Sequence, residues 1–208
     1  MLRSFEVPIT IITYNRPEKL NKLLNSLSKI KPKNIYVISD GPKDKSKDKI
    51  LVEECRDAIN NISWEHKLTV NYSDFNLGLR KRVETGLDWV FSQVEYSIIL
   101  EDDCIPNKTF FGYAEFYLEK YKNNNKVSMI AGSNLYPSLT NSYKRDVFFS
   151  NSALIWGWAT WKRSWVNYSK HSDMWSNYTK RLKVCLKVFK INYSIGNVIN
   201  YYRIMHKV

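Results

Sequence analysis

Cysteine and histidine are scarce in this 208-residue chain, which has three of each. Cys55, Cys104 and Cys185 lie far apart, and no Cys-x-x-Cys pair or Cys/His cluster has the spacing of a zinc site. This usage excludes a disulfide scaffold and a zinc finger, and it favours a reducing compartment. The three histidines are scattered, so each is read as a structural or surface residue rather than a metal ligand.

Glycine-rich motifs and long apolar runs are also missing. The chain has seven glycines, and neither a GxGxxG sequence nor a P-loop is present. No run approaches the roughly 18 uncharged apolar residues that cross a membrane. The first residues lack the apolar core and cleavage site of a signal peptide, so the sequence predicts a cytoplasmic protein.

Acidic residues nearly disappear after residue 146. Residues 1–146 contain 22 basic and 19 acidic residues, whereas residues 147–208 contain ten basic residues and one acidic residue, Asp173. Such a cationic segment suits anionic partners, namely nucleotide phosphates, lipid headgroups or nucleic acid. A solvated basic face would give the same composition.

Strand and helix signals alternate over the first 132 residues. Apolar and β-branched runs predict strands at residues 7–14, 34–39, 67–72, 96–100 and 127–131. Apolar residues at helical spacing predict a helix after each of the first four strands. The alternation indicates βαβ units, so we expect an α/β fold with a mostly parallel, Rossmann-type sheet flanked by helices.

The pattern changes after residue 133. A short candidate strand at 147–150 precedes a segment in which five of the seven tryptophans lie within residues 156–175. Residues 179–191 carry apolar side chains on one helical face and lysines mainly on the other. We therefore expect a tryptophan-rich helical C-terminal part within a single domain, 1–208, with halves at 1–132 and 133–208.

Polar clusters follow four of the predicted strands. They are Thr13–Arg16, Ser39–Gly41, Asn76–Gly78 and Glu101–Asp103. Because the carboxyl ends of parallel strands meet at one edge, where ligands of such sheets bind, we expect these clusters to form a site.

Three consecutive carboxylates, Glu101, Asp102 and Asp103, form the sharpest of these clusters. They repel one another unless a cation is near, and alternation along an extended chain places Glu101 and Asp103 on one face. Oxygen ligands suit Mg²⁺ or Mn²⁺, with phosphate oxygens and water completing the coordination. An acidic turn or helix N-cap is the alternative.

Two further features have a structural and a functional interpretation. Asp40, followed by Gly41 and Pro42, stands where doubly wound folds place an acid facing a base or ribose, but this sequence is also a common turn. The Trp156-Gly157-Trp158 segment suits stacking on sugar rings, and a packed core would use the same indoles.

Several segments in order resemble nucleotide-sugar glycosyltransferases of the GT-A fold. They are PITIITYNRPEKLNKLLNSL, VISDGPK, NLGLRKRVETGLDWVF, YSIILEDDCIPNKTFFGYAEFYLEKY and WGWATWKRSW, which together span about residues 7–165. The likeness is greatest to bacterial family-2-type sugar transferases, and the EDD segment is also similar to that of the N-acetylglucosaminyltransferase I group.

The resemblance implies a role for each matching residue. Thr13, Tyr14, Asn15 and Arg16 would line the nucleotide pocket, Asp40 would face the base or ribose, and Asn76, Gly78 and Arg80 would approach the nucleotide. Asp102 would contact the ribose or sugar. Asp103, with Glu101 as a less favoured second ligand, would coordinate Mn²⁺ or Mg²⁺ on the diphosphate. Trp156, Gly157 and Trp158 would border the donor sugar and the acceptor.

An inverting transfer also needs a carboxylate base, which relatives usually supply beyond the tryptophan-rich segment. Asp173 is the candidate there, although its surroundings do not match the family base clearly. The alternatives are a base from the first half of the chain or a C-terminally shortened enzyme that stops before its base.

The resulting hypothesis is a hexosyl- or N-acetylhexosaminyltransferase of cell-surface polysaccharide assembly. It would take a UDP- or GDP-linked donor and a saccharide or lipid-linked acceptor, with the basic stretch 179–191 touching the inner face of the membrane. The rivals are a nucleotide- and metal-binding remnant that cannot catalyse, a nucleotidyltransferase, and a nucleic-acid-binding protein. Nucleic acid is not the expected partner, because the acidic triplet would repel its phosphates.

Overall fold

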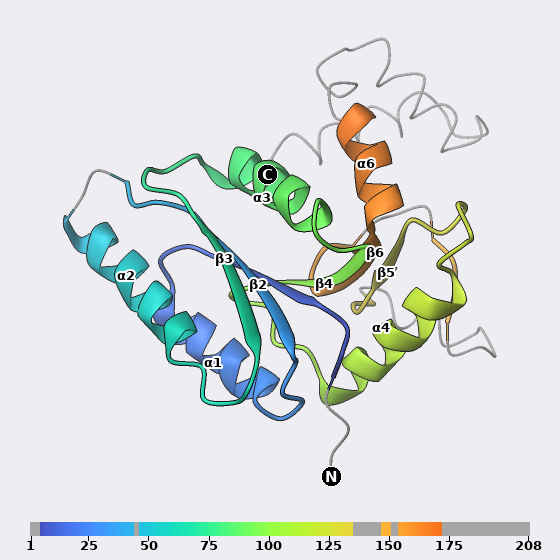
Figure 1. The fold of residues 1–208 in the computed structure, drawn as a ribbon, viewed down its shortest axis with the longest axis horizontal. Coiled ribbons are helices and arrows are strands. Elements are labelled where there is room, and N and C mark those ends of the chain that lie inside the picture. Colours follow the sequence, from blue (N-terminus) through green and yellow to red (C-terminus); the bar gives the residue numbers. More distant parts are fainter. Residues whose placement is uncertain (1–4, 44–45, 135–146, 151–153, 172–208) are drawn as a thin grey trace, which may run out of the picture. The chain divides into compact units, whose positions relative to one another are not determined.

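The computed structural model describes residues 5–43, 46–134, 147–150 and 154–171. Within them a six-stranded sheet carries helices on both faces (Figure 1). The strands are β1 (Ile9–Thr13), β2 (Asn34–Ser39), β3 (Lys67–Tyr72), β4 (Tyr96–Glu101), β5 (Met129–Ala131) and β6 (Trp158–Trp161). The helices are α1 (Pro17–Leu27), α2 (Ser46–Asn60), α3 (Leu79–Phe91), α4 (Lys108–Lys120) and α6 (Lys162–His171).

The strands lie in the order β3-β2-β1-β4-β6-β5. The first four strands in this order are parallel to one another, and β6 is antiparallel to both β4 and β5. The predicted α/β fold with a mostly parallel sheet is confirmed, and β2 and β3 have the predicted bounds.

Two details of the second half differ from the sequence-based expectation. Residues 147–150 form no strand, so that prediction is wrong; their run of apolar residues does not pair with the sheet. The tryptophan-rich segment begins as β6 and becomes helical only at α6. Pairing of β6 between β4 and β5 overrides the helical reading of this segment, because tertiary context outweighs local propensity.

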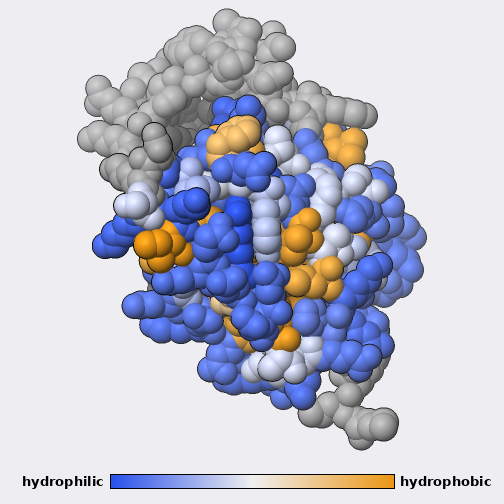
Figure 2. All heavy atoms as spheres, turned by 60° about the vertical axis from the view of Figure 1, so that its left-hand side comes forward, coloured by the Kyte–Doolittle hydropathy of each residue, from blue (hydrophilic) through white to orange (hydrophobic). Residues whose placement is uncertain are grey.

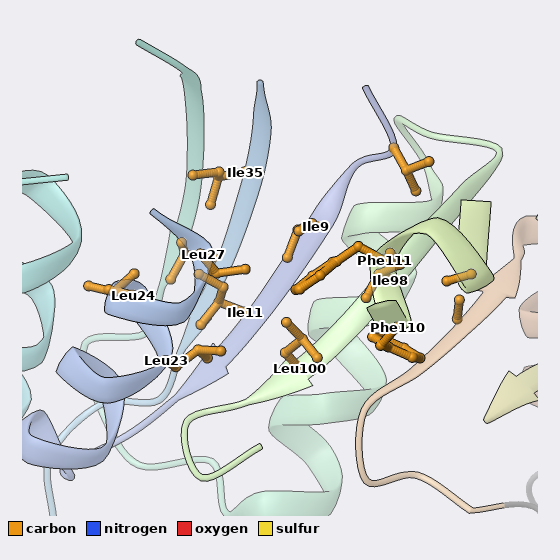
Figure 3. Close-up of a cluster of buried hydrophobic side chains, with 14 of the residues drawn as sticks. Ile9, Ile11, Leu23, Leu24, Leu27, Ile35, Ile98, Leu100, Phe110 and Phe111 are labelled. Carbon is orange, nitrogen blue, oxygen red and sulfur yellow. The ribbon is translucent and has the colours of Figure 1, made fainter. Parts of the chain in front are cut away.

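The larger part of the core lies between the sheet and helices α1, α2 and α4. Alternation along the strands sends Ile9, Ile11, Ile98 and Leu100 to this face (Figure 3). The leucines of α1 at helical spacing meet them there and cover this face of β1.

The second core cluster covers the opposite face, where Ile12, Ile38 and Ile99 meet α3 and Trp165 of α6. Helix α3 approaches β2 closely at Gly86, where an added Cβ would lie 2.5 Å from Cγ2 of Ile38. A glycine is therefore required for this packing, which brings the middle of α3 close to the end of β2.

Helix α2 buries only Val52, Cys55 and Ile59. The side of the molecule that carries α2 is largely hydrophilic, with small apolar spots (Figure 2).

No helix in the described part of the chain is both long enough and apolar enough to cross a bilayer. By its contacts the chain groups into Met1–Val166 and Asn167–Val208, and only the first five residues of the second unit are described.

Candidate functional site

The parallel register brings the four polar clusters to one edge of the sheet. Thr13 pairs with Ser39, Ser39 pairs with Tyr72, and Ile12 pairs with Glu101. Strand β6 runs in the opposite direction and pairs Trp158 with Ile99, so its first residues lie at the same edge. The site that the sequence predicts is therefore assembled from loops after β1, β2, β3 and β4 and from the segment that enters β6.

The acidic triplet at the end of β4 has one buried and two accessible members. Asp102 is buried, and its Oδ2 lies 3.5 Å from the hydroxyl of Thr13 at the end of β1. Asp103 is 39% exposed, and Glu101 is half-buried. The alternation of the strand thus turns Asp102 toward the protein and leaves Asp103 accessible to a ligand.

Two cationic side chains from the start of α1 surround Asp103. Its Oδ2 lies 2.9 Å from Nη1 of Arg16 and 3.3 Å from Nζ of Lys19, and Arg16 also lies 3.5 Å from Asp102. Sequence reasoning selected Arg16 but missed Lys19. The signal was available, because residues three apart lie on one face of a helix.

The carboxyl groups of the triplet do not ionise independently. Burial raises the pKa of Glu101, and the charges of Asp103 and Asp102 raise it further. Burial also raises the pKa of Asp102, while the charge of Arg16 opposes that change. A cation placed here would relieve the repulsion between these groups.

The described residues contain no group of three His, Cys, Asp or Glu side chains arranged to hold a metal ion. The triplet fits a divalent cation only as a partial ligand set of one or two carboxylates. The remaining positions would come from diphosphate oxygens and water, which is how Mg²⁺ is usually bound at phosphate sites.

Asp40 connects the end of β2 to the loop before α3. Its Oδ1 accepts hydrogen bonds from the backbone N–H groups of Gly41 at 3.0 Å and Leu77 at 2.9 Å, and its Oδ2 accepts one from Gly78 at 3.1 Å. Asn76 adds a bond from its side-chain amide to the carbonyl of Gly41 at 3.0 Å. The buried carboxylate therefore fixes the β3–α3 loop against β2.

Two glycines allow this contact between loops. An added Cβ on Gly41 would lie 2.4 Å from the backbone nitrogen of Phe75, so a side chain there would collide with the loop. Gly78 has a φ of +78°, which L side chains rarely adopt. The predicted site residue Gly78 is thus required for the loop conformation.

The arginines of α3 have different surroundings. Arg80 has an exposed side chain, and its Nε lies 3.0 Å from Glu84. Arg82 is buried; its Nε donates to the carbonyl of Ser39 at 3.2 Å, and its Nη2 donates to the carbonyl and the side chain of Asn71. Arg82 therefore joins the ends of β2 and β3.

Tyr14 and Asn15 contact a residue that sequence reasoning missed. Both donate hydrogen bonds to the carboxylate of Asp48 in the first turn of α2. The pair Tyr14 and Asp48 is 34 residues apart in the chain, and no local pattern links them.

The tryptophans satisfy both interpretations, but through different residues. Trp158 packs on the Ile99 side of the sheet, Trp161 donates from Nε1 to the carbonyl of Leu118, and Trp165 donates from Nε1 to Asp88. Trp156 is 61% exposed, and Gly157 beside it has a φ of +68°. Among the tryptophans that the structure describes, Trp156 is therefore the one with an accessible indole face at the site edge. Asp173 lies outside the described residues.

An acidic triplet and polar loops at the carboxyl edge of this sheet define a protein of the GT-A class. The family model described as glycosyl transferase family 2 matches residues 9–196. The match spans most of the chain, so the chain belongs to glycosyl transferase family 2 and is a glycosyltransferase.

Other comparisons add little to this assignment. A search of curated proteins gave no significant match. Among solved structures, the chain is similar to 4-diphosphocytidyl-2C-methyl-D-erythritolsynthase from Anaerococcus prevotii DSM 20548, with a TM-score of 0.43 and 13% identity over 95% of this chain and 83% of that chain. A likeness at this level carries no argument about activity.

Proposed function

We propose that this protein transfers a hexosyl or N-acetylhexosaminyl group from a nucleotide-diphosphate donor to a saccharide acceptor, with inversion and with a divalent cation. The observation that carries the proposal is the acidic triplet beside Arg16, at the edge where the loops after β1, β2 and β4 meet. Membership of glycosyl transferase family 2 supports transfer of a sugar from a nucleotide-sugar donor.

The donor nucleotide is assigned to the loops of β1, β2 and β3. Its proposed contacts are Thr13, Tyr14, Asn15, Arg16, Asp40, Asn76, Gly78, Arg80 and Asp102. The hydrogen bonds from Asp40 to the β3–α3 loop support this assignment, because they hold two of these loops in a fixed relation before a ligand binds. A preformed pocket avoids the entropic cost of ordering loops on binding.

Mn²⁺ or Mg²⁺ is assigned to Asp103, with Glu101 as the second candidate ligand. A bound cation would neutralise the charge that grows on the leaving diphosphate. The exposure of Asp103 and the raised pKa of Glu101 support this assignment, since both make the triplet receptive to a positive charge. Arg16 and Lys19 supply further positive charge at the same place.

The acceptor is assigned to the segment that enters β6. An exposed indole such as Trp156 presents a flat apolar face on which a sugar ring can stack. Asp173 is the proposed base that removes the proton from the acceptor hydroxyl. A base from the first half of the chain is the alternative.

We place the reaction at the cytoplasmic face of a membrane, in cell-surface polysaccharide assembly with a saccharide or lipid-linked acceptor. The support is compositional: residues 147–208 contain ten basic residues and one acidic residue. Binding to vesicles of anionic lipid should weaken with salt, because surface attraction is screened. Absence of binding at low salt would contradict the membrane contact.

Thermal unfolding with a panel of nucleoside diphosphates, with and without Mn²⁺, tests the donor site. A ligand at 100 times its Kd adds about 2.7 kcal/mol. Each kcal/mol moves the Tm of a chain of this size by roughly 2–4 °C. We expect one diphosphate to raise the Tm by several degrees in a Mn²⁺-dependent manner, and Asp103→Asn to remove the rise.

The same panel separates the alternatives. No shift with any diphosphate would overturn the proposal. A shift without subsequent sugar transfer would identify a binding protein that has lost catalysis.

A further inference from the structure

Three hydrogen-bond donors from two different loops converge on the carboxylate of Asp48. Tyr14 donates from its hydroxyl to Oδ2 at 2.5 Å, and Asn15 donates from Nδ2 to Oδ1 at 2.6 Å. The backbone N–H of Lys43 donates to Oδ2 at 2.5 Å. Tyr14 and Asn15 belong to the loop after β1, and Lys43 belongs to the loop after β2, so one side chain of α2 joins both.

The ionisation states of Asp48 and Tyr14 favour the hydrogen bond between them. Burial opposes the charge on Asp48, but the hydrogen bonds from Tyr14, Asn15 and Lys43 outweigh it and lower the pKa of the carboxyl group. Burial and the bond to Asp48 raise the pKa of Tyr14 to about 12. The phenol therefore stays protonated and donates to an ionised carboxylate throughout the physiological range.

The two joined loops are those that flank the proposed nucleotide pocket. The first carries Tyr14 and Asn15, and the second begins at Asp40, whose charge is felt at the hydroxyl of Tyr14. Asp48 lies in the first turn of α2, where the helix dipole also favours a negative charge. Its hydrogen bonds to both loops place it to orient the donor-binding residues Tyr14 and Asn15.

We propose that Asp48 is a positioning residue for the donor site. It fixes the ring of Tyr14 and the amide of Asn15 against the loop after β2, so that these side chains are already oriented when the nucleotide binds. The inference rests on the proposed function, because the two loops must bind the donor for Asp48 to matter to catalysis. Its effect is expected on donor binding rather than on the chemical step.

Binding of a nucleoside diphosphate with Mn²⁺ to Asp48→Asn tests the inference. The probe is the diphosphate that stabilises the wild-type protein. The amide keeps the size of the side chain but loses its charge and part of its acceptor capacity. We expect the Kd to rise about tenfold, the loss typical of hydrogen bonds to a charged group. KM for the donor should rise similarly while kcat changes little.

Two further variants are compared with Asp48→Asn. Asp57→Asn makes the same substitution at an exposed position of the same helix and should leave the Kd unchanged. Tyr14→Phe removes one of the three bonds and leaves the carboxylate in place, so its Kd should rise by about threefold. This variant keeps the test valid even if Asp48→Asn folds poorly.

Carbon-13 NMR of labelled tyrosine supplies a readout that does not depend on catalysis. The signal of Tyr14 is identified by its absence in Tyr14→Phe. It should titrate near 12 in the wild-type protein and at lower pH in Asp48→Asn, because the negative charge and one of the two acceptor oxygens are gone. An unchanged titration would show that the bond is not formed and would overturn the inference.

The outcomes distinguish this inference from the function on which it rests. If the wild-type protein binds a diphosphate and Asp48→Asn binds it equally well, the positioning role is overturned and the proposed function stands. If the wild-type protein binds no nucleoside diphosphate, the proposed function fails and the role of Asp48 in donor binding fails with it. Weaker binding in Asp48→Asn with an unchanged kcat supports the inference.

Discussion

The two sides of the candidate site use their charged groups differently. On the side of β2 and β3, Asp40 and Arg82 are buried, and their polar atoms bind backbone groups of neighbouring loops and strands. On the side of β4, Glu101 and Asp103 are more accessible, and the triplet combines mutual repulsion with ion pairs to Arg16 and Lys19. The first side is built as a scaffold and the second as a binding surface for charge.

This difference shows how one sheet edge serves stability and chemistry at once. Buried charged groups whose polar atoms are all hydrogen-bonded hold the loops in fixed positions. Clustered carboxylates at the accessible end repel one another, and a positively charged ligand can relieve this repulsion. Substitutions on the two sides should therefore change stability in opposite directions.

Replacing Arg82 should have the largest effect on stability. Arg82→Met keeps much of the side-chain volume but removes the hydrogen bonds that Arg82 donates to the carbonyl of Ser39 and to both oxygens of Asn71. The carbonyl of Ser39 keeps its second bond, from the backbone N–H of Ser73. We expect a loss of about 3 kcal/mol in the free energy of unfolding, measured by urea denaturation. Arg80→Met, at an exposed pair on the same helix, should change it by about 0.5 kcal/mol at most. Equal effects of the two variants would contradict the scaffold role of the β2–β3 side.

Neutralising Glu101 should stabilise the protein at neutral pH. The pKa of Glu101 is raised in the folded state, so the folded protein binds more protons than the unfolded chain between the two pKa values. The contribution of protonated Glu101 to the free energy of unfolding is therefore complete at acid pH, and it is lost as the pH rises through the folded-state pKa. Glu101→Gln removes this loss and should gain about 0.5–1 kcal/mol at pH 7.

Thermal unfolding as a function of pH measures this gain. The curves of Glu101→Gln and wild type should converge below about pH 4, where the carboxyl group is protonated in both states. Glu54→Gln, at an exposed position of α2, serves as the control and should show no such pH-dependent gain. A gain that does not depend on pH would mean that the charge of Glu101 is not its cause.

Replacing Lys19 should have the smallest effect. Lys19→Met removes an exposed ion pair with Asp103, and such pairs contribute little to stability. We expect a change within about 0.5 kcal/mol in urea denaturation at low salt, and none at about 1 M salt, where surface charges are screened. A large loss would place Lys19 in the scaffold and weaken the contrast between the two sides.

Much of the fold was predictable because β1, β2 and β4 are buried over nearly their whole length and so consist mainly of apolar and β-branched residues. β2 and β3 begin and end where their apolar and β-branched runs do, and turn residues follow them directly. The tryptophan-rich segment was less predictable. Trp158–Trp161 forms a strand because β4 and β5 accept it between them, and neither partner is near in sequence.

The residues of the candidate site were also predictable only in part. The residues at the strand ends, such as Asp40 and Asp103, could be selected from sequence because parallel strands must bring their ends together. Asp48 and Lys19 were missed, and the scaffold role of Arg82 was not predicted. Each of these three acts through a partner at least eleven residues away.

The sequence by itself determined the alternation of strands and helices, the edge at which the polar clusters meet, and membership of the glycosyltransferase class. These follow from local periodicity and from the ordered motifs of one chain. Only the tertiary structure decided which charges became buried scaffold and which stayed accessible. Burial and hydrogen-bond partners depend on how loops distant in sequence pack at the sheet edge, and a residue type such as arginine suits either role.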